Sequence, residues 1–130
     1  MGVTMHPPTD SGWHQWDRAG YRVDVARGCV VVAAYGDIDL ETSVGLDHAV
    51  HDALRTSHHL ILDLAQVNFI DSSGLGVLVR ARRDATSLGG SVALVRPPPA
   101  VQKILVGTQL QQSFTVFSRL DDALDAPHSS

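Results

Sequence analysis

The sequence predicts a single α/β domain in which a mixed, mostly parallel five-stranded sheet carries helices packed on it. Two observations point to this class. From about residue 20 to residue 125, apolar runs of strand length alternate with amphipathic segments of helix length. The first two strand segments are instead joined by a link at residues 26–28, which is too short for a helix and favours a hairpin. The predicted order is therefore β-β-α-β-α-β-α-β-α, and a length of 130 residues suits one such domain.

The first half of the domain supplies two strands and a long helix. Residues 21–25 alternate between apolar and polar side chains, as a half-buried strand does. Residues 29–35 form a continuous apolar run rich in β-branched residues, and Gly36 is expected to end this strand. A helix is predicted over residues 40–54, with Asp39 placed to cap its start. One apolar face of that helix is formed by Leu46, Ala49, Val50, Ala53 and Leu54.

The middle of the chain continues the alternation. Residues 60–64 are a predicted strand, followed by a loop at residues 65–70. A second helix is expected over residues 73–87, and the glycine pair that follows it closes that helix. Residues 91–95 form the fourth predicted strand.

The last predicted elements are shorter. Three consecutive prolines at residues 97–99 stop the fourth strand and start a short helix, which Gly107 ends. Residues 114–117 are the fifth strand, and residues 120–124 form a final helical turn.

Both ends of the chain are predicted to lie outside the domain. Residues 1–19 are expected to form a flexible tail, because prolines, a glycine and polar residues interrupt any periodicity there, and residues 126–130 a frayed end. Trp13 and Trp16 are the apolar exception within the tail; they pack onto the domain, the more common outcome, or meet a partner. Because of these two apolar residues, both a monomer and a weak dimer are compatible with the sequence.

The composition excludes several classes of protein. A formal net charge of −4, with no Lys/Arg-rich run, argues against binding nucleic acid through its phosphates. Cys29 is the only cysteine, which excludes an intramolecular disulfide and favours a small buried core residue. No segment approaches the roughly 20 apolar residues of a membrane span, and the chain does not start like a secretory signal. A cytoplasmic location is expected by elimination.

The segment at residues 67–78 is the most informative. Gly74 and Gly76 fall in the first turns of the predicted second helix, although each interior glycine costs about 1 kcal/mol relative to alanine. Glycine is favoured there if another backbone or a partner must approach closely, and tight packing of the helix on the sheet is equally compatible with it.

Two serines, Ser72 and Ser73, precede those glycines at the start of the helix. Free backbone N–H groups and the positive end of the helix dipole tolerate a phosphate at such a position. A phosphate would add roughly −1.5 to −2 charges beside Asp71 and expel a partner that docks through apolar or acidic groups. The alternative, that Asp71 or Ser72 is only a helix cap, fits the residue types as well.

The segment FIDSSGLG at residues 69–76 resembles the signature of the STAS-domain anti-sigma factor antagonists. The resemblance extends over about residues 20–125. It includes GDID after the second strand, LILDL in the central strand, the glycine pair before the fourth strand, the proline-led helix and LDDAL near the end. It implies a single STAS-like domain.

The resemblance also implies a function. In that family an anti-sigma factor that is also a serine kinase phosphorylates the serine that matches Ser72. The unphosphorylated antagonist binds this partner and frees a sigma factor, phosphorylation breaks the complex, and a serine phosphatase restores it. The match implies that the chain catalyses nothing itself. We also expect no cofactor, no nucleic acid and no membrane insertion. The implied docking surface comprises Asp39, Asp71, Ser72, Ser73, Gly74, Leu75 and Gly76.

Three alternatives stay open. The chain could be a non-phosphorylated STAS subunit of a membrane transport or stress-signalling complex, with the same fold and another partner. Ser72 or Ser73 could be an enzyme nucleophile, although the Gly-x-Ser-x-Gly elbow is missing. His48 and His51, spaced i, i+3 beside Asp52, could bind a metal, although three or four converging ligands are normally needed.

Overall fold

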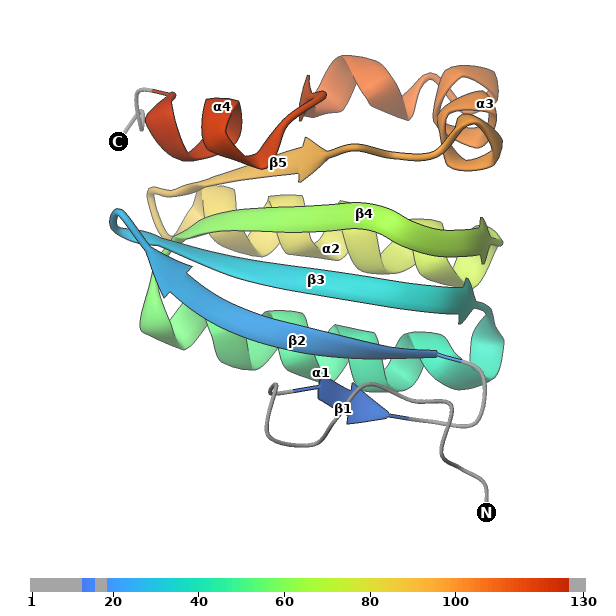
Figure 1. The fold of residues 1–130 in the computed structure, drawn as a ribbon, viewed down its shortest axis with the longest axis horizontal. Helices are drawn as coiled ribbons and strands as arrows, with labels where there is room; N and C mark the ends of the chain where they lie inside the picture. The colour runs from blue at the N-terminus through green and yellow to red at the C-terminus, as the bar shows by residue number, and fades with distance from the viewer. Residues whose placement is uncertain (1–12, 16–18, 127–130) are drawn as a thin grey trace.

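The computed structural model describes residues 13–15 and 19–126. A mixed sheet runs through the molecule, and its strand order follows the order of the chain from β1 to β6. The first two pairs of strands are antiparallel, and the later pairs are all parallel (Figure 1). The strands are β1 (Trp13–Gln15), β2 (Ala19–Ala26), β3 (Cys29–Ile38), β4 (His59–Ile70), β5 (Ser91–Val95) and β6 (Thr115–Phe117).

Three crossover helices join the parallel strands. They are α1 (Leu40–Thr56), α2 (Ser72–Ser87) and α3 (Pro99–Gly107). Right-handed crossovers between strands that succeed one another in a single direction place their helices on the same face of the sheet. Figure 1 shows α1 and α2 side by side behind the sheet. In the described residues, no helix is both long enough and apolar enough to cross a lipid bilayer.

Two apolar clusters hold the layers together. The larger cluster lies between the sheet and the crossover helices, and all five residues of the predicted α1 stripe are buried in the core. The smaller cluster lies on the other face, where α4 (Leu120–Asp125) packs beside β5 and β6. Burying these apolar side chains at roughly 25 cal/mol per Å² is the main force that holds helices and sheet together.

The structure contains the five predicted strands and adds a short strand, β1, among the described residues. Residues 13–15 were expected within the tail, but they pair antiparallel with β2, Trp13 opposite Arg22. The placement of Trp16 lies outside the described residues. At the other end, the short 3-10 helix η2 (Leu110–Ser113), which had no predicted counterpart, precedes β6.

Two boundary predictions were wrong. Gly36 does not end β3, because the strand continues to Ile38 with Gly36 at a φ of +89°. Residues 65–70 are not a loop, because they extend β4. The β3–β4 register shifts twice there, so that one extra β4 residue enters each time. These bulges break the alternation of apolar and polar side chains by which a strand is identified in a sequence.

Candidate functional site

The candidate site lies where the carboxyl ends of β3 and β4 meet, at the right-hand ends of these strands in Figure 1. Ile38 and Ile70, the last residues of these parallel strands, are register partners. The next residue of each strand, Asp39 or Asp71, begins the crossover helix. Two helix N-termini therefore stand side by side, which brings together the predicted residues of both segments.

Asp71 is the N-cap of α2. Its Oδ1 accepts hydrogen bonds from the backbone N–H of Ser73 at 2.8 Å and of Gly74 at 3.3 Å. These bonds satisfy two of the amides that a helix leaves without internal partners. The cap predicted for this helix is thus the aspartate, and its carboxylate faces the amides of the first turn.

Ser72 occupies the first helical position, directly after the cap, and is exposed. Its hydroxyl makes no hydrogen bond to any residue that the structure describes. The cap explanation therefore holds for Asp71 and not for Ser72. Ser73 is half-buried, so the more accessible hydroxyl of the pair is that of Ser72.

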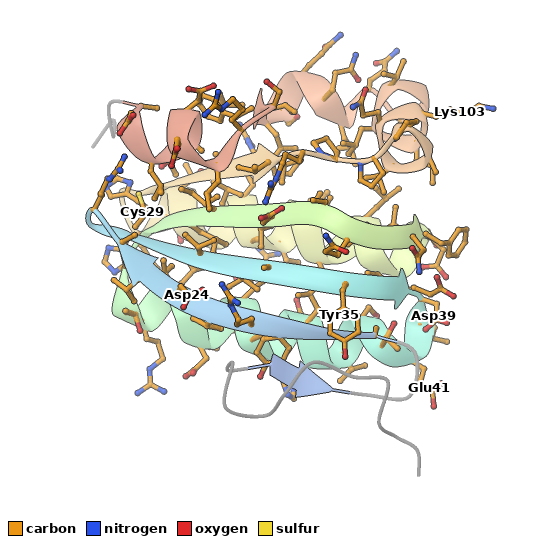
Figure 2. The ribbon with its side chains drawn as sticks, in the orientation of Figure 1. Asp24, Cys29, Tyr35, Asp39, Glu41 and Lys103 are labelled. Carbon is orange, nitrogen blue, oxygen red and sulfur yellow. The ribbon has the colours of Figure 1, made fainter. Side chains whose placement is uncertain are left out.

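Asp39 caps α1 in the same way. Its Oδ1 accepts from the backbone N–H groups of Glu41 and Thr42, each at 3.1 Å. The Asp39 N–H in turn donates to Thr42 Oγ1 at 2.9 Å, which completes a capping box. Figure 2 shows Asp39 and Glu41 at this end of the domain. The structure thus confirms the cap, and places Asp39 on the helix start next to the one that carries Ser72.

Gly74 is buried and serves internal packing. A Cβ at this position would lie 2.3 Å from Ile70 Cγ1 and 2.9 Å from Ile38 Cγ2. Only glycine lets the first turn of α2 sit this close to the ends of the two strands. Of the two explanations for this glycine, the structure favours helix–sheet packing over direct contact with a partner. Leu75, the next residue, is half-buried and packs against the same core.

Gly76 differs from Gly74 because it faces an arginine. A Cβ at Gly76 would lie 3.1 Å from Arg80 Nη1, a flexible side-chain atom. The Arg80 Nε donates to Asp47 Oδ1 of α1 at 3.2 Å. One turn beyond Ser72, the guanidinium group of Arg80 therefore lies over the backbone of Gly76. The same group links α2 to α1.

Exposed apolar side chains occur on β4, α1 and α2, and the motif does not include all of them. Leu40 at the first position of α1 is 75% exposed, and Phe69 near the end of β4 is 48% exposed. Val44 and Val79 are further exposed valines, one on each of the two helices. Leu40 and Val44 are apolar residues that lie outside the buried stripe of α1. This mismatch is the sequence signal that could have identified them as exposed. Single exposed apolar side chains are common on protein surfaces, and they mark a docking surface only where they form a contiguous patch.

The geometry of the described residues supports neither chemical alternative, the enzyme nucleophile or the metal site. In the described residues, no three His, Cys, Asp or Glu side chains come together as metal ligands, so His48, His51 and Asp52 form no such cluster. A histidine does contact a serine, since His59 Nδ1 lies 3.0 Å from Ser91 Oγ. This pair is at the amino ends of β4 and β5, at the opposite end of β4 from Ser72. Cys29 is also at that far end, buried, and desolvation raises the pKa of its thiol (Figure 2).

Comparison with known proteins adds to this geometry. The family model described as STAS domain matches residues 21–123. The anti-sigma F factor antagonist of Paenibacillus polymyxa is 29% identical over 100 residues, which cover 75% of this chain and 86% of that protein. The anti-sigma-F factor antagonist RsfB of Mycobacterium tuberculosis is 30% identical over 100 residues, which cover 75% of this chain and 80% of that protein. The crystal structure of an anti-sigma factor antagonist from Mycobacterium paratuberculosis superposes with a TM-score of 0.73 at 28% identity, covering 83% of this chain and 92% of that one.

Proposed function

Because this chain belongs to the STAS-domain anti-sigma factor antagonist family, we propose that it binds an anti-sigma factor with serine kinase activity while Ser72 is unmodified. Phosphorylation of Ser72 by that partner releases the complex, and a serine phosphatase restores binding. In this proposal the chain is a regulator of transcription that works by partner switching in the cytoplasm, and it needs no cofactor of its own.

The observation that carries the proposal is the separation of two roles at the start of α2. Asp71 caps the helix, while Ser72 is exposed and keeps its hydroxyl out of the hydrogen bonds that hold the fold. A kinase can therefore reach the Ser72 oxygen without unfolding the helix. A serine that served as the cap would instead have its hydroxyl turned towards the backbone amides of the first turn.

In the phosphorylation step this chain supplies only the serine hydroxyl. The Ser72 Oγ attacks the γ-phosphorus of ATP in the partner's site, the hydroxyl loses its proton, and ADP leaves. The product carries roughly −1.5 to −2 charges at the N-terminus of α2, where the helix dipole and the backbone amides favour negative charge. The fold consequently survives the modification, and what changes is the surface.

The effect on a docked partner follows from the neighbours of Ser72. Leu40 and Phe69 offer apolar surface that a bound partner would bury away from water. A phosphate between such contacts must either lose its water or keep the partner away, and the carboxylates of Asp39 and Asp71 add repulsion. The proposed docking surface also includes Ser73, Leu75 and Gly76, which follow Ser72 in α2. Gly74 contributes indirectly, because its lack of a side chain lets α2 pack close to the strand ends.

Affinity for the kinase-type anti-sigma factors encoded in the same genome tests the proposal. We compare wild type, Ser72→Ala and Ser72→Glu by calorimetric titration. The matched control is Ser87→Glu, which adds the same charge at an exposed serine at the far end of α2. The proposal expects binding by wild type, Ser72→Ala and Ser87→Glu, and loss of binding by Ser72→Glu.

Two results would contradict the proposal. Equal binding by all four proteins would mean that Ser72 lies outside the interface and that control resides elsewhere. Absence of binding to every such kinase would favour the other function considered for this fold, a subunit of a membrane transport complex, and would direct the search to membrane partners.

A further inference from the structure

One face of α2 carries Ser72, Gly76 and Arg80 at successive intervals of four residues. Residues four apart in a helix are neighbours on the same face, with about 5–6 Å between Cβ positions. Long side chains in helices point back towards the N-terminus. Arg80 is therefore directed along this face towards Ser72, and Gly76 is the residue between them.

The guanidinium group of Arg80 lies over Gly76. A Cβ on Gly76 would stand 3.1 Å from Nη1 and 3.7 Å from both Cζ and Nη2. The group therefore occupies the space that a side chain at residue 76 would otherwise fill, one helical turn from Ser72. Gly76 itself places no side chain on this face between the guanidinium and residue 72.

The orientation of this guanidinium is set by α1. Its Nε donates to Asp47 Oδ1 at 3.2 Å, and both side chains are partly exposed, at 44% and 39%. Nε is thus directed to α1, while both Nη atoms face the Gly76 side. Arginine presents its donors as a planar fork, so one guanidinium can hold a carboxylate through Nε and an oxyanion through its Nη atoms.

From this geometry we propose that Arg80 binds the phosphate of phosphorylated Ser72 within the same molecule, across the gap left by Gly76. The inference rests on the proposed function, since it concerns the phosphorylated state. The phosphoryl oxygens lie three bonds beyond the Ser72 Cβ and so extend into the space of one helical turn that separates them from the Nη atoms. Arginine–phosphate pairs of this kind form short, charge-assisted hydrogen bonds.

The consequence is a phosphate that lies flat along α2 instead of projecting into solvent. It joins Asp47, Arg80 and the phosphate into one charged row across the α1–α2 surface. That row covers the surface next to the exposed Val44 and Val79, where a partner would make apolar contact. Phosphorylation then changes the shape and the polarity of the surface beyond Ser72 itself.

The experiment uses the full chain with phosphoserine installed at residue 72 by genetic code expansion, so that no kinase is needed. The pH titration of the phosphate is followed by ³¹P NMR in this protein and in its Arg80→Gln form. A nearby guanidinium favours the dianion. We expect the last phosphate proton to bind about threefold more weakly with Arg80 present, the effect of a partly exposed ion pair.

Two further variants distinguish direct contact between Arg80 and the phosphate from the general effect of positive charge on α2. Arg82→Gln removes the same charge from α2 at a position about 200° around the helix from Arg80, and it should titrate like the parent. Gly76→Ala keeps the charge but places a methyl group against the guanidinium, and it should titrate between the parent and Arg80→Gln. Circular dichroism confirms that each variant is folded.

The proposal is overturned if Arg80→Gln and the parent titrate together, or if Arg82→Gln shifts the titration as much as Arg80→Gln does. Neither result depends on whether any kinase binds the chain. Conversely, failure of the binding experiments with Ser72→Ala and Ser72→Glu would leave this titration unchanged, so the two proposals fail separately.

Discussion

The backbone N–H of Asp71 donates a hydrogen bond to the carbonyl oxygen of Ile38 at 3.2 Å. This single bond joins the residue that caps α2 to the strand that leads into α1. It lies at the carboxyl ends of β3 and β4, where Asp39 and Asp71 follow the register partners Ile38 and Ile70. The relative position of Asp39 and Asp71 therefore depends on the register of β3 and β4 before it depends on any side chain.

Replacing the cap should cost stability, whereas replacing the serine should not. Asp71→Ala leaves the Ser73 and Gly74 amides without their acceptor, and we expect the free energy of unfolding to fall by about 1 kcal/mol. Ser72→Ala should change it by less than about 0.5 kcal/mol, because the hydroxyl supports no hydrogen bond among the described residues. Urea denaturation measures both. A loss for Ser72→Ala equal to that for Asp71→Ala would show that Ser72 shares the capping role.

The two glycines of α2 should respond in opposite directions to alanine. Gly74→Ala forces a methyl group to within 2.3 Å of Ile70, and we expect it to destabilise the domain by roughly 1–3 kcal/mol. Gly76→Ala meets only the movable end of Arg80 and gains helix propensity, so it should be neutral or stabilising by up to about 1 kcal/mol. Thermal denaturation of both variants checks this. Equal destabilisation would mean that Gly76 also packs against something rigid.

Exposed apolar residues near Ser72 should matter for binding and not for folding. We expect Leu40→Ser and Phe69→Ser each to weaken affinity for the anti-sigma factor by roughly tenfold, the typical effect of removing a well-packed interface side chain. Val25→Ser is the control, because Val25 is 62% exposed and lies by the hairpin at the opposite end of the sheet. If all three variants bind alike, the partner does not cover this apolar surface.

Alkaline pH should destabilise the domain through Cys29. Burial raises the pKa of this thiol, so the folded chain holds the proton more tightly than the unfolded chain does. The stability linked to this group is complete below the thiol's ordinary pKa and is lost as pH rises through the raised value. Urea denaturation across alkaline pH should therefore show a shallower decline for Cys29→Ala than for wild type.

Tyr35 provides the comparison for that measurement. Burial raises the pKa of its hydroxyl as well, so Tyr35→Phe should remove a separate part of the alkaline decline. A decline that is the same for wild type and Cys29→Ala would show that ionisation of the thiol is not linked to unfolding.

Periodicity and cap chemistry predicted much of the fold. The α1 stripe is buried, Asp39 is the cap, and the proline-led helix α3 follows β5 as expected. The extension of β4 to Ile70 was missed because its bulges mix Gln66 and Asn68 into the strand, and a bulge is a property of two paired strands. β1 was missed because a three-residue edge strand is stabilised by its neighbour β2 and hardly by its own sequence.

The candidate site shows the same division. The motif selected Ser72, but the residues that set its surroundings come from other segments. Arg80 and Asp47 meet only because α1 and α2 lie side by side, and the periodicity of each helix taken alone does not show that contact. Similarly, the separate tasks of Gly74 and Gly76 depend on which face of α2 meets the sheet, and sequence spacing leaves that choice open.

The order of the strands along the sheet bears on how the domain is made. Each β-strand from β3 onward docks beside the strand that preceded it in synthesis, with its crossover helix laid on the same side. Both helix starts of the candidate site, with Arg80, are contained in residues 29–87. These residues leave the ribosome before β5, but α2 packs against β5, so the candidate site is complete only once the later strand has docked beside β4.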